Sequence, residues 1–389
     1  MKKIIMMVVV LTFFAGCSKL SQKPEFISYS TKKPKNILIF NDGTGNDRDT
    51  RTNIRRLFEI IANQDRPDIY AYYDKGVGAS LLQKITGNAL GVGFSRNVRE
   101  AYAFISANYR PGDKIYLFGF SRGAFTSRAL SGMIKFCGLM RFPSPPKNLT
   151  PEELEKLDEQ NHQNVAALYN IYKRNRKSSF KNELETFKQK HETIDADIEM
   201  IGVWDTVEAL GMPTLSNVPE DHEHKFYRFE LHDNIKKAYH VLSIDDLRKY
   251  FWPMLWKKKN GELKKGQILE QVWFAGVHSD VGGGYEDSRE LAGLSLNWML
   301  RKLEQEGLIH PGYRVSEDPL GKIHDSWTQL YAVQGDMGKR VRDDIVAEHK
   351  IHKSVQIRLR NDKKYRPEQF NQCAPDFNLS QCLGVQVVE

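Results

Sequence analysis

Residues 114–123, KIYLFGFSRG, decide the fold of this chain. The apolar run KIYLF is typical of a buried strand, and residues 122–136, which follow, carry apolar side chains at helical spacing. Between them stands GFSRG, the G-x-S-x-G pattern that holds a serine on a sharp strand-to-helix turn. Gly119 and Gly123 leave the space that a Cβ atom beside this serine would fill. The pattern therefore predicts a nucleophile elbow, with Ser121 held at the edge of a sheet and at a helix N-terminus.

The same alternation of strand and helix extends along the chain on both sides of this turn. Four more apolar runs are predicted to be buried strands, at residues 36–40, 68–73, 198–204 and 272–277. Two more stretches with apolar residues at helical spacing are predicted to be helices, at residues 53–63 and 96–109. Repeated units of this kind indicate an α/β fold, with a mainly parallel sheet covered by helices on both faces. Residues 151–192, rich in Glu, Lys, Asn and Gln, predict a helical insertion, either a lid or a solvated excursion.

Two later strand ends supply the partners that a serine nucleophile needs. A hydroxyl is weak until a base takes its proton, and nucleophile-elbow enzymes place an acid and then a histidine after the serine. Asp205 directly follows the strand at 198–204, and His278 follows the strand at 272–277. We expect His278 to act as general base and then general acid, while Asp205 orients and stabilises the imidazole.

Alternatives for the base and the acid stay open at this point. His324 has Asp325 beside it and is the rival base, but His278 is favoured because a strand end is a more rigid platform than a loop. Asp280, the rival acid, would need a tight turn to reach the imidazole two residues away, and is expected to anchor the glycine loop that follows it. His240, in an amphipathic stretch, is expected to be a packed or capping side chain.

A tetrahedral intermediate also needs hydrogen-bond donors for its oxyanion. The N–H of Arg122, directly after the serine, is one expected donor. The second is expected from the loop NDGTG at residues 41–45, where glycines let backbone N–H groups approach an oxygen closely. Gly43 and Thr44 are the candidates.

Three patterns typical of other chemistry are incomplete. The string DGT at 42–44 is similar to a phosphatase motif of the haloacid dehalogenases, which needs an aspartate two positions earlier, where this chain has Phe40. The G-x-G at 91–93 lacks the third glycine of a dinucleotide loop, because Arg96 stands there. The H-x-H at 222–224 lacks a third metal ligand. We therefore expect neither a cofactor nor a metal.

The composition predicts a folded globular protein. The chain has 389 residues, of which 40% are hydrophobic and 27% charged, a profile that excludes a disordered chain. The net charge of +8 comes from 57 basic and 49 acidic residues spread along the sequence, so no nucleic-acid arm and no nucleic-acid partner is expected. A mild positive charge suits residence at an anionic membrane surface.

The N-terminus predicts export to the bacterial cell envelope. Lys2 and Lys3 precede an apolar run at residues 4–14 that is short for a bilayer span, so residues 1–16 are predicted to be a signal peptide. The sequence Ala-Gly-Cys that follows resembles a lipobox, in which Cys17 is lipidated and becomes the first mature residue. A phenylalanine in place of the usual leucine leaves ordinary secretion as the alternative.

The residues after the signal predict a lipid-anchored protein on a tether. Residues 17–35 are polar and basic, without apolar periodicity. Ser18, where many inner-membrane lipoproteins have aspartate, makes the outer membrane the expected destination.

The cysteines predict one buried side chain and leave one pairing open. Cys137 stands in an apolar helical context and is expected in the core. Residues 371–389 are predicted to be a C-terminal tail, in which Cys373 and Cys382 would be able to pair in an oxidising compartment. Spacing alone leaves that pairing undecided.

Several blocks of this sequence resemble a known family, and they read IFNDGTGN, YYDKGVG, NVREAYAFISANYRPGDKIYLFGFSRGAFTSRALSGMI, GVWDTVEALG, AYHVLSIDDLRKYFWPMLW and VWFAGVHSDVGGGY. They are similar to an uncharacterised α/β-hydrolase domain family related to the catalytic domain of bacterial type VI secretion phospholipase effectors of the first lipase class. Weaker matches place the domain at residues 36–370. The resemblance implies an α/β-hydrolase fold and a serine esterase with Ser121, Asp205 and His278 as its triad. Gly45 departs from the tryptophan common in the family.

The residues and the resemblance together predict a membrane-anchored serine hydrolase that cleaves carboxylic esters, with phospholipid acyl esters as the expected substrates. The N-terminal lipid would hold the enzyme at the bilayer. One alternative is a catalytically inert binding or immunity-like lipoprotein with the same fold. Another is an esterase that removes acyl groups from cell-wall glycans. The sequence identifies no protein partner.

Overall fold

The computed structural model describes residues 25–27, 34–43, 50–64, 66–76, 87–143, 145–146, 149–207, 229–248, 251–326, 342, 345 and 349–389. Cys17 and the predicted signal peptide lie outside these residues, as does Thr44. Among the helices described, none is long and apolar enough to cross a bilayer.

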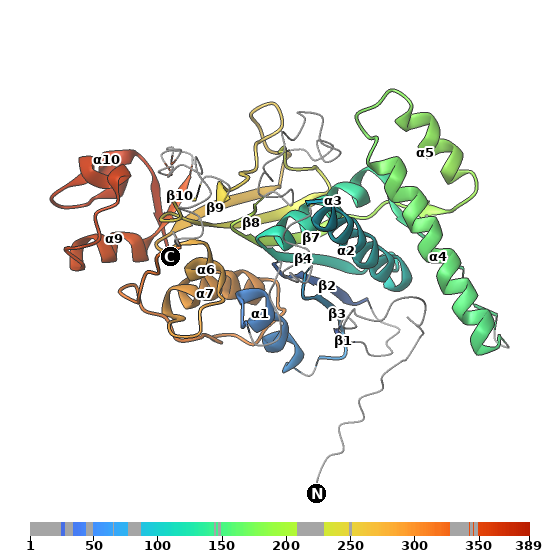
Figure 1. Cartoon of the computed structure of the whole chain (residues 1–389), viewed down its shortest axis with the longest axis horizontal. Helices are drawn as coiled ribbons and strands as arrows, with labels where there is room; N and C mark the ends of the chain where they lie inside the picture. Colours follow the sequence, from blue (N-terminus) through green and yellow to red (C-terminus); the bar gives the residue numbers. More distant parts are fainter. Residues whose placement is uncertain are drawn as a thin grey trace, which may run out of the picture.

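Within these residues a nine-stranded sheet forms the centre of the fold, in the order β1-β3-β2-β4-β7-β8-β9-β10-β11 (Figure 1). All neighbouring strands are parallel except β1 and β3, which are antiparallel. The strands are β1 (Glu25–Ile27), β2 (Asn36–Asn41), β3 (Ile69–Asp74), β4 (Lys114–Phe120), β7 (Ile198–Trp204), β8 (Ile235–Ser243), β9 (Ile268–Phe274), β10 (Lys350–His352) and β11 (Gln386–Val388). A small antiparallel sheet joins β5 (Leu139–Met140) to β6 (Thr193–Ile194).

Helices cover both faces of the large sheet, as the sequence predicts (Figure 1). Ile37 and Ile39 on β2 belong to one buried cluster with α2 and α3, whereas Leu38 and Phe40 belong to another with α1 and α7. Successive side chains of a strand point to opposite faces, so one apolar run serves both clusters. The helices are α1 (Asn53–Ala62), α2 (Gly87–Asn108), α3 (Arg122–Cys137), α4 (Pro151–Tyr172), α5 (Phe180–Lys188), α6 (His278–Gly282), α7 (Glu290–Gln305), α9 (Lys353–Asn361) and α10 (Leu379–Leu383).

The insertion predicted at residues 151–192 contains two helices, α4 and α5, at one end of the molecule (Figure 1). Thr150 and Glu153 form a capping box, in which each side chain accepts a hydrogen bond from the other's backbone N–H. The apolar side chains that α4 buries lie in its second half, from Val165 to Tyr172, where they join the cluster of α2 and α3. This half therefore fixes the insertion to the sheet domain.

Strand β8 differs from the sequence interpretation, which placed His240 in an amphipathic stretch. The apolar residues of IKKAYHVLS stand three, four, six and seven positions after the first, a helical spacing. In the structure the second half of β8 is buried on both faces between β7 and β9. A strand at the centre of a parallel sheet needs no polar alternation, so its pattern is not diagnostic. His240 itself is fully buried.

The segments predicted as tether and tail both contribute to the sheet. Within residues 17–35, β1 pairs with β3, and Lys35 is buried in an ion pair of 2.5 Å with Asp113. At the other end β11 (Gln386–Val388) pairs with β10, so the segment predicted as a C-terminal tail contributes the edge strand of the sheet. Long-range strand pairing leaves no local signal, which is why neither strand was predicted.

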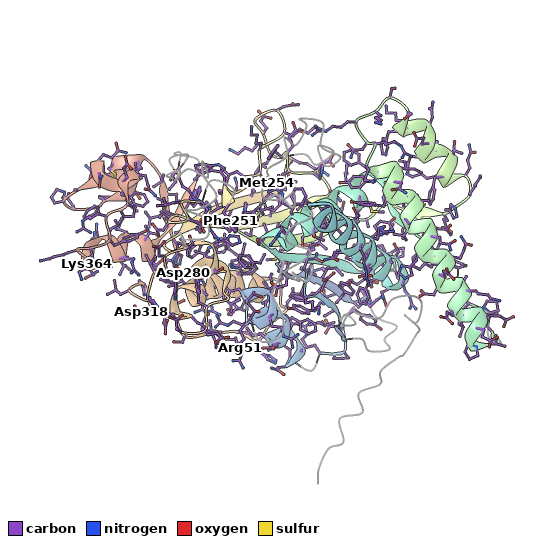
Figure 2. All side chains as sticks on the ribbon, viewed as in Figure 1. Arg51, Phe251, Met254, Asp280, Asp318 and Lys364 are labelled. Carbon is purple, nitrogen blue, oxygen red and sulfur yellow. A yellow bond between two sulfur atoms is a disulfide. The ribbon has the colours of Figure 1, made fainter. Side chains whose placement is uncertain are left out.

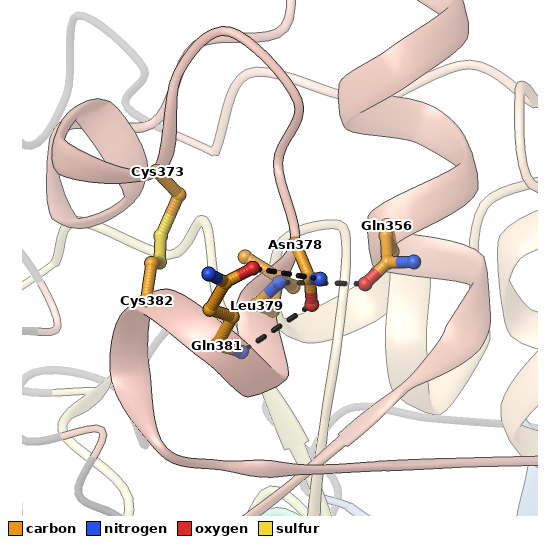
Figure 3. Close-up of a disulfide and its surroundings, with 6 residues drawn as sticks. All are labelled: Gln356, Cys373, Asn378, Leu379, Gln381 and Cys382. Carbon is orange, nitrogen blue, oxygen red and sulfur yellow. Dashed lines mark hydrogen bonds between the residues drawn. A yellow bond between two sulfur atoms is a disulfide. The ribbon is translucent and has the colours of Figure 1, made fainter.

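A disulfide closes this C-terminal region (Figure 3). Cys373 and Cys382 are bonded, with their Cα atoms 5.5 Å apart, which decides the pairing that spacing left open. Cys373 is buried with Phe370, Phe377 and Leu379 in a cluster that also contains α9 and the end of β8. The crosslink therefore ties the last helix to this cluster.

Replacing both Cys373 and Cys382 with serine is expected to lower the free energy of unfolding by about 2–3 kcal/mol, because a crosslink across about ten residues restricts the unfolded chain. Denaturant unfolding followed by tryptophan fluorescence measures this change. The control is Lys364→Ser, at an exposed residue of the same region (Figure 2). This variant is expected to leave the midpoint of denaturant unfolding unchanged. An unaltered midpoint in the double variant would contradict the prediction.

Candidate active site

The turn after β4 has the geometry of a nucleophile elbow. Ser121 has a φ of +57°, a strained value for a residue other than glycine. A Cβ atom on Gly119 would lie 2.5 Å from the carbonyl oxygen of Gly123, and a Cβ atom on Gly123 would lie 2.1 Å from that of Asn41. Both positions therefore accept only glycine in this backbone, which places Ser121 on a sharp turn at the start of α3.

Strand register brings the three predicted catalytic residues to one edge of the sheet. Phe120 pairs with Trp204 across β4 and β7, so Ser121 and Asp205 both directly follow paired residues. The Ser121 N–H donates to the carbonyl oxygen of Trp204 at 3.0 Å. On the next strands, β8 and β9 end together, and His278 begins α6 a few residues later. This is the carboxyl edge, as expected for parallel strands.

Asp205 and His278 are in direct contact. His278 Nδ1 lies 2.7 Å from Asp205 Oδ2, and the two residues are 3% and 0% exposed. Because an ionised carboxylate only accepts hydrogen bonds, Nδ1 carries the proton in the neutral imidazole and Nε2 carries the lone pair. Among the described residues His278 Nε2 has no hydrogen-bond partner. The ring therefore presents a base to the site.

His278 is linked to the serine turn through Phe120, and it makes no hydrogen bond to Ser121. The imidazole packs on Phe120, the residue before the serine, with ring centroids 4.6 Å apart. Phe251 contacts the imidazole in a T-shaped arrangement, with ring centroids 5.0 Å apart. Two aromatic rings thus contact the imidazole, and its Nε2 makes no hydrogen bond to Ser121 Oγ in this structure. Such contacts are often long without substrate.

Arg342 is a functional residue that the sequence interpretation missed. Its side chain is fully buried and donates to Asp205 Oδ1 at 3.0 Å, to Ser243 Oγ at 2.8 Å and to the Phe251 carbonyl oxygen at 2.6 Å. Ser243 in turn donates its hydroxyl to Asp205 Oδ2 at 2.9 Å. Arg342 stands 137 residues after Asp205 in a charged stretch, so no local pattern marks it.

The charges of the site favour an ionised Asp205 and a neutral His278. Burial by itself would raise the pKa of Asp205, but Arg342 and the hydrogen bond from His278 hold it well below its usual range. Burial lowers the pKa of His278, and the Asp205 carboxylate opposes this only in part. Two further charges act on the imidazole: Arg248 lowers its pKa and Asp246 raises it.

The rival histidine and the rival acid pair with each other instead of with Ser121 or His278. His324 Nδ1 lies 2.5 Å from Asp280 Oδ1, and its Nε2 lies 3.0 Å from Asp287 Oδ1. Asp280 also accepts from the N–H groups of Val277 and His324. Both ring nitrogens of His324 face carboxylates, so neither is directed at Ser121. Through these hydrogen bonds Asp280 stabilises the turn directly before the glycine loop that it was expected to anchor.

The oxyanion donors are placed only in part. Arg122 begins α3, where first-turn N–H groups lack acceptors within the helix. The Gly43 N–H donates to Asp42 Oδ1 at 2.7 Å, so in this structure it faces a carboxylate, and Thr44 lies outside the described residues. The second donor therefore stays a prediction. In the described part of the chain no three His, Cys, Asp or Glu side chains gather as metal ligands.

The sequence matches one family model over most of the sheet domain. Residues 35–302 match the family described as T6SS, Phospholipase effector Tle1-like, catalytic domain. The uncharacterized protein YEL023C of Saccharomyces cerevisiae is 30% identical over 206 residues, which are 46% of this chain and 27% of that protein. The match therefore spans only about a quarter of the yeast protein's length.

Solved structures similar to this chain include two esterases. Esterase 2 of Thermogutta terrifontis is 11% identical, with a TM-score of 0.37 over 74% of this chain and 91% of that chain. Carboxylesterase Cest-2923 of Lactobacillus plantarum is 12% identical, with a TM-score of 0.34 over 74% and 94%. An uncharacterized protein from Pseudomonas aeruginosa is 16% identical, with a TM-score of 0.35 over 71% and 46%. The parallel sheet and serine elbow of this chain form the α/β-hydrolase fold that the sequence predicts.

Arg342→Met is expected to reduce kcat for a p-nitrophenyl ester about 100-fold with little change in KM, because Asp205 would lose the cation that keeps it ionised and oriented. Steady-state kinetics measure this, and Arg342→Lys is expected to restore part of the loss. The pH profile of Arg342→Met separates this electrostatic role from a purely structural one, because only loss of the cation beside Asp205 would change the profile. A folded variant with unchanged kcat and profile would contradict the prediction.

The pH dependence of kcat/KM is expected to reflect the lowered pKa of His278. The base is the neutral imidazole, so activity rises with pH through the His278 pKa, with a midpoint below about 6.5. Arg248→Gln removes a cation that lowers this pKa, so its midpoint is expected to move upward. Arg314→Gln, at a residue paired with Glu304, is the control. A downward shift in Arg248→Gln would contradict the assignment.

Proposed function

Because this chain belongs to the family of type VI secretion phospholipase effector Tle1-like catalytic domains, we propose that it is a serine hydrolase that cleaves carboxylic esters, with phospholipid acyl esters as its substrates. The observation that carries the proposal is the buried Asp205–His278 pair, whose imidazole packs on Phe120, the residue before Ser121, and whose Nε2 has no partner among the described residues. A nucleophile, an oriented base and an acid are the groups that ester hydrolysis through an acyl-enzyme requires.

In the first half of the proposed reaction, Ser121 Oγ attacks the ester carbonyl carbon while His278 Nε2 takes the hydroxyl proton. The carbonyl oxygen becomes an oxyanion, which the Arg122 N–H stabilises at the N-terminus of α3. The C–O bond to the alcohol then breaks, and His278 returns the proton to the departing oxygen. The product at this stage is an acyl ester on Ser121.

In the second half, water takes the place of the alcohol. His278 Nε2 accepts a proton from this water as its oxygen attacks the acyl carbon, and then returns the proton to Ser121 Oγ as the fatty acid leaves. Asp205 stabilises the imidazolium in both halves. Arg342 and Ser243 keep Asp205 in place, which limits the reorganisation needed when charge develops.

The proposal includes attachment to a membrane. Lipidation at Cys17 and export to the bacterial cell envelope, with the outer membrane as destination, follow from the sequence pattern. The net charge of +8 supports residence near anionic lipid. An anchored hydrolase meets its lipid substrate in the bilayer that holds it, so a phospholipid is the substrate most accessible to this site.

Ser121→Ala and His278→Gln are expected to lower kcat for a p-nitrophenyl ester and for a fluorogenic phospholipid by at least about 1000-fold, because each removes a group that bonds or transfers a proton. A fluorophosphonate probe is expected to label the full chain at Ser121 and to fail in Ser121→Ala. The matched control is His324→Gln, whose histidine already has carboxylates at both ring nitrogens and whose turnover is expected within about threefold of the parent.

Each outcome of this experiment distinguishes a function. Labelling with turnover of the short ester alone would retain the mechanism and exclude phospholipid, in favour of another ester such as an acylated glycan. No labelling of a folded protein would overturn the proposal and favour an inert binding protein. Full activity in His278→Gln with loss in His324→Gln would reverse the assignment of the base.

A further inference from the structure

The turn that carries the catalytic base is held by three carboxyl groups. It spans residues 276–278, after β9 and at the start of α6, and each of its backbone N–H groups donates to a different aspartate. These hydrogen bonds run from Gly276 to Asp245 Oδ2 at 2.6 Å, from Val277 to Asp280 Oδ2 at 3.0 Å and from His278 to Asp246 Oδ2 at 3.1 Å. An N–H that donates to an ionised acceptor forms a stronger hydrogen bond than one that donates to a neutral acceptor. The proton transfers of the proposed hydrolysis use none of the three carboxyl groups.

Two of these aspartates reach the turn because β8 and β9 stay in parallel register beyond their ends. The Ile244 N–H donates to the Phe274 carbonyl oxygen at 3.0 Å, and the Asp245 N–H donates to the Gly276 carbonyl oxygen at 3.1 Å. Asp245 and Asp246 therefore lie beside the turn, and their side chains accept N–H groups that are two residues apart.

The turn itself has a sharp backbone. Gly276 has a φ of +114°, a conformation that glycine adopts readily and other residues rarely adopt. A Cβ atom on Gly276 would lie 2.6 Å from the Cβ atom of Asp280. Asp280 belongs to α6 and accepts from Val277, three residues before it, so this bond is local. Of the three aspartates, Asp245 and Asp246 are the ones that tie the turn to the neighbouring strand.

Asp246 is connected to the imidazole of His278 as well as to its backbone. Asp246 is 1% exposed and accepts from Arg248 Nε at 3.0 Å and from Arg248 Nη2 at 2.6 Å. The guanidinium carbon of Arg248 lies 3.4 Å from the ring centroid of Phe251, and this ring contacts the imidazole. One ion pair thus reaches His278 twice, once through the backbone N–H and once through Phe251.

Asp245 connects the same turn to the C-terminal region. Its carboxyl group accepts from the Tyr365 hydroxyl at 3.0 Å, and Tyr365 is buried in the cluster that contains Cys373. Tyr365 lies beyond residue 302, where the family match ends, and so does Arg342, which donates to Asp205. The C-terminal region therefore supports the acid through Arg342 and the turn of the base through Tyr365.

We propose that Asp245 and Asp246 are positioning residues for the catalytic base, and that together they clamp the turn at residues 276–278 so that His278 Nε2 keeps its place during proton transfer. The inference rests on the proposed ester hydrolysis for its kinetic readout. A reacting group displaced by about 1 Å can lose about 100-fold in rate, so we expect the clamp to act on kcat. The clamp itself is measurable without turnover, so the two proposals are tested separately.

The first test separates the hydrogen bond of Asp245 from its charge. Burial raises the pKa of Asp245 to about 7, and either protonation state leaves an oxygen that accepts the Gly276 N–H. Asp245→Leu removes this acceptor and is expected to lower kcat for p-nitrophenyl butyrate about 10- to 100-fold, with KM within about threefold. Asp245→Asn retains an acceptor and is expected to stay within about threefold of the parent. A folded Asp245→Leu with unchanged kcat, or equal losses in both variants, would overturn the assignment.

The second test uses the charge of Asp246. Asp246 raises the pKa of His278 and Arg248 lowers it, while Asp205, paired with Arg342, faces Nδ1 of the same ring. Asp246→Asn is therefore expected to move the midpoint of kcat/KM against pH downward, opposite to the shift expected for Arg248→Gln. Its kcat is expected to fall about 10-fold, because one amide oxygen replaces two carboxylate oxygens. Loss of packing alone would not separate the two midpoints, so midpoints that coincide or move in the same direction would overturn the assignment.

Hydrogen exchange measures the clamp without catalysis. In the full chain with Ser121→Ala, adding Asp245→Leu is expected to speed exchange of the amide hydrogens at residues 276–278 at least about tenfold, while those of β4 keep their rate. Mass spectrometry of the corresponding peptides reports both regions. Unchanged exchange at 276–278 would overturn the clamp, and equally faster exchange in β4 would indicate global destabilisation and overturn the positioning role. If the parent hydrolyses no ester but exchange changes as expected, the hydrolase proposal fails and the clamp stands.

The matched control is Asp318, an exposed aspartate whose side chain also accepts a backbone N–H, from Leu320 at 2.8 Å (Figure 2). Asp318→Leu removes the same kind of hydrogen bond from a loop that does not carry the base. It is expected to leave kcat, the pH midpoint and exchange at residues 276–278 unchanged. A loss of kcat equal to that of Asp245→Leu would overturn the assignment, because the effect would then not depend on the turn.

Discussion

The carboxylate of Asp205 has no access to solvent, and its negative charge persists only because four donors meet it there. Ser243 supplies a backbone N–H and a hydroxyl, Arg342 a guanidinium N–H and His278 a ring N–H. These donors come from the end of β8, from Arg342, which stands 137 positions after Asp205, and from the start of α6. The orientation of the imidazole, and with it the position of Nε2, follows from the need to compensate this one buried charge.

The position of Ser121 depends on a steric constraint and not on a charge. The approach of α3 to the end of β2 is so close that Gly123 nearly touches the backbone of Asn41, and a side chain there would separate them. The Asn41 amide also donates to Ser127 Oγ at 2.9 Å, and that hydroxyl donates to the Phe118 carbonyl oxygen at 2.8 Å. Asn41, which begins the loop expected to supply the second oxyanion donor, is thus bonded to the helix that carries Ser121.

Thr206, the residue after Asp205, is connected to Arg128 on α3 through Met254. His240 Nε2 accepts from the Thr206 N–H at 3.2 Å, an arrangement that requires a neutral imidazole, and its lowered pKa ensures this at neutral pH. Thr206 accepts in turn from Met254, whose carbonyl oxygen holds Arg128. These hydrogen bonds fix the segment that follows β8 to the residue after Asp205 and to α3.

The sequence by itself determined the features that depend on neighbouring residues: the elbow at Ser121, the apolar strands, and the acid and base at strand ends. Local sterics and burial on both faces of a parallel sheet leave patterns in consecutive residues, and these are readable without a structure. Only the tertiary structure decided the features that depend on distant parts of the chain: Arg342 against Asp205, the disulfide of Cys373 and Cys382, and the edge strands β1 and β11. Which charge meets which partner is set by packing in space, and spacing along the chain carries no record of it.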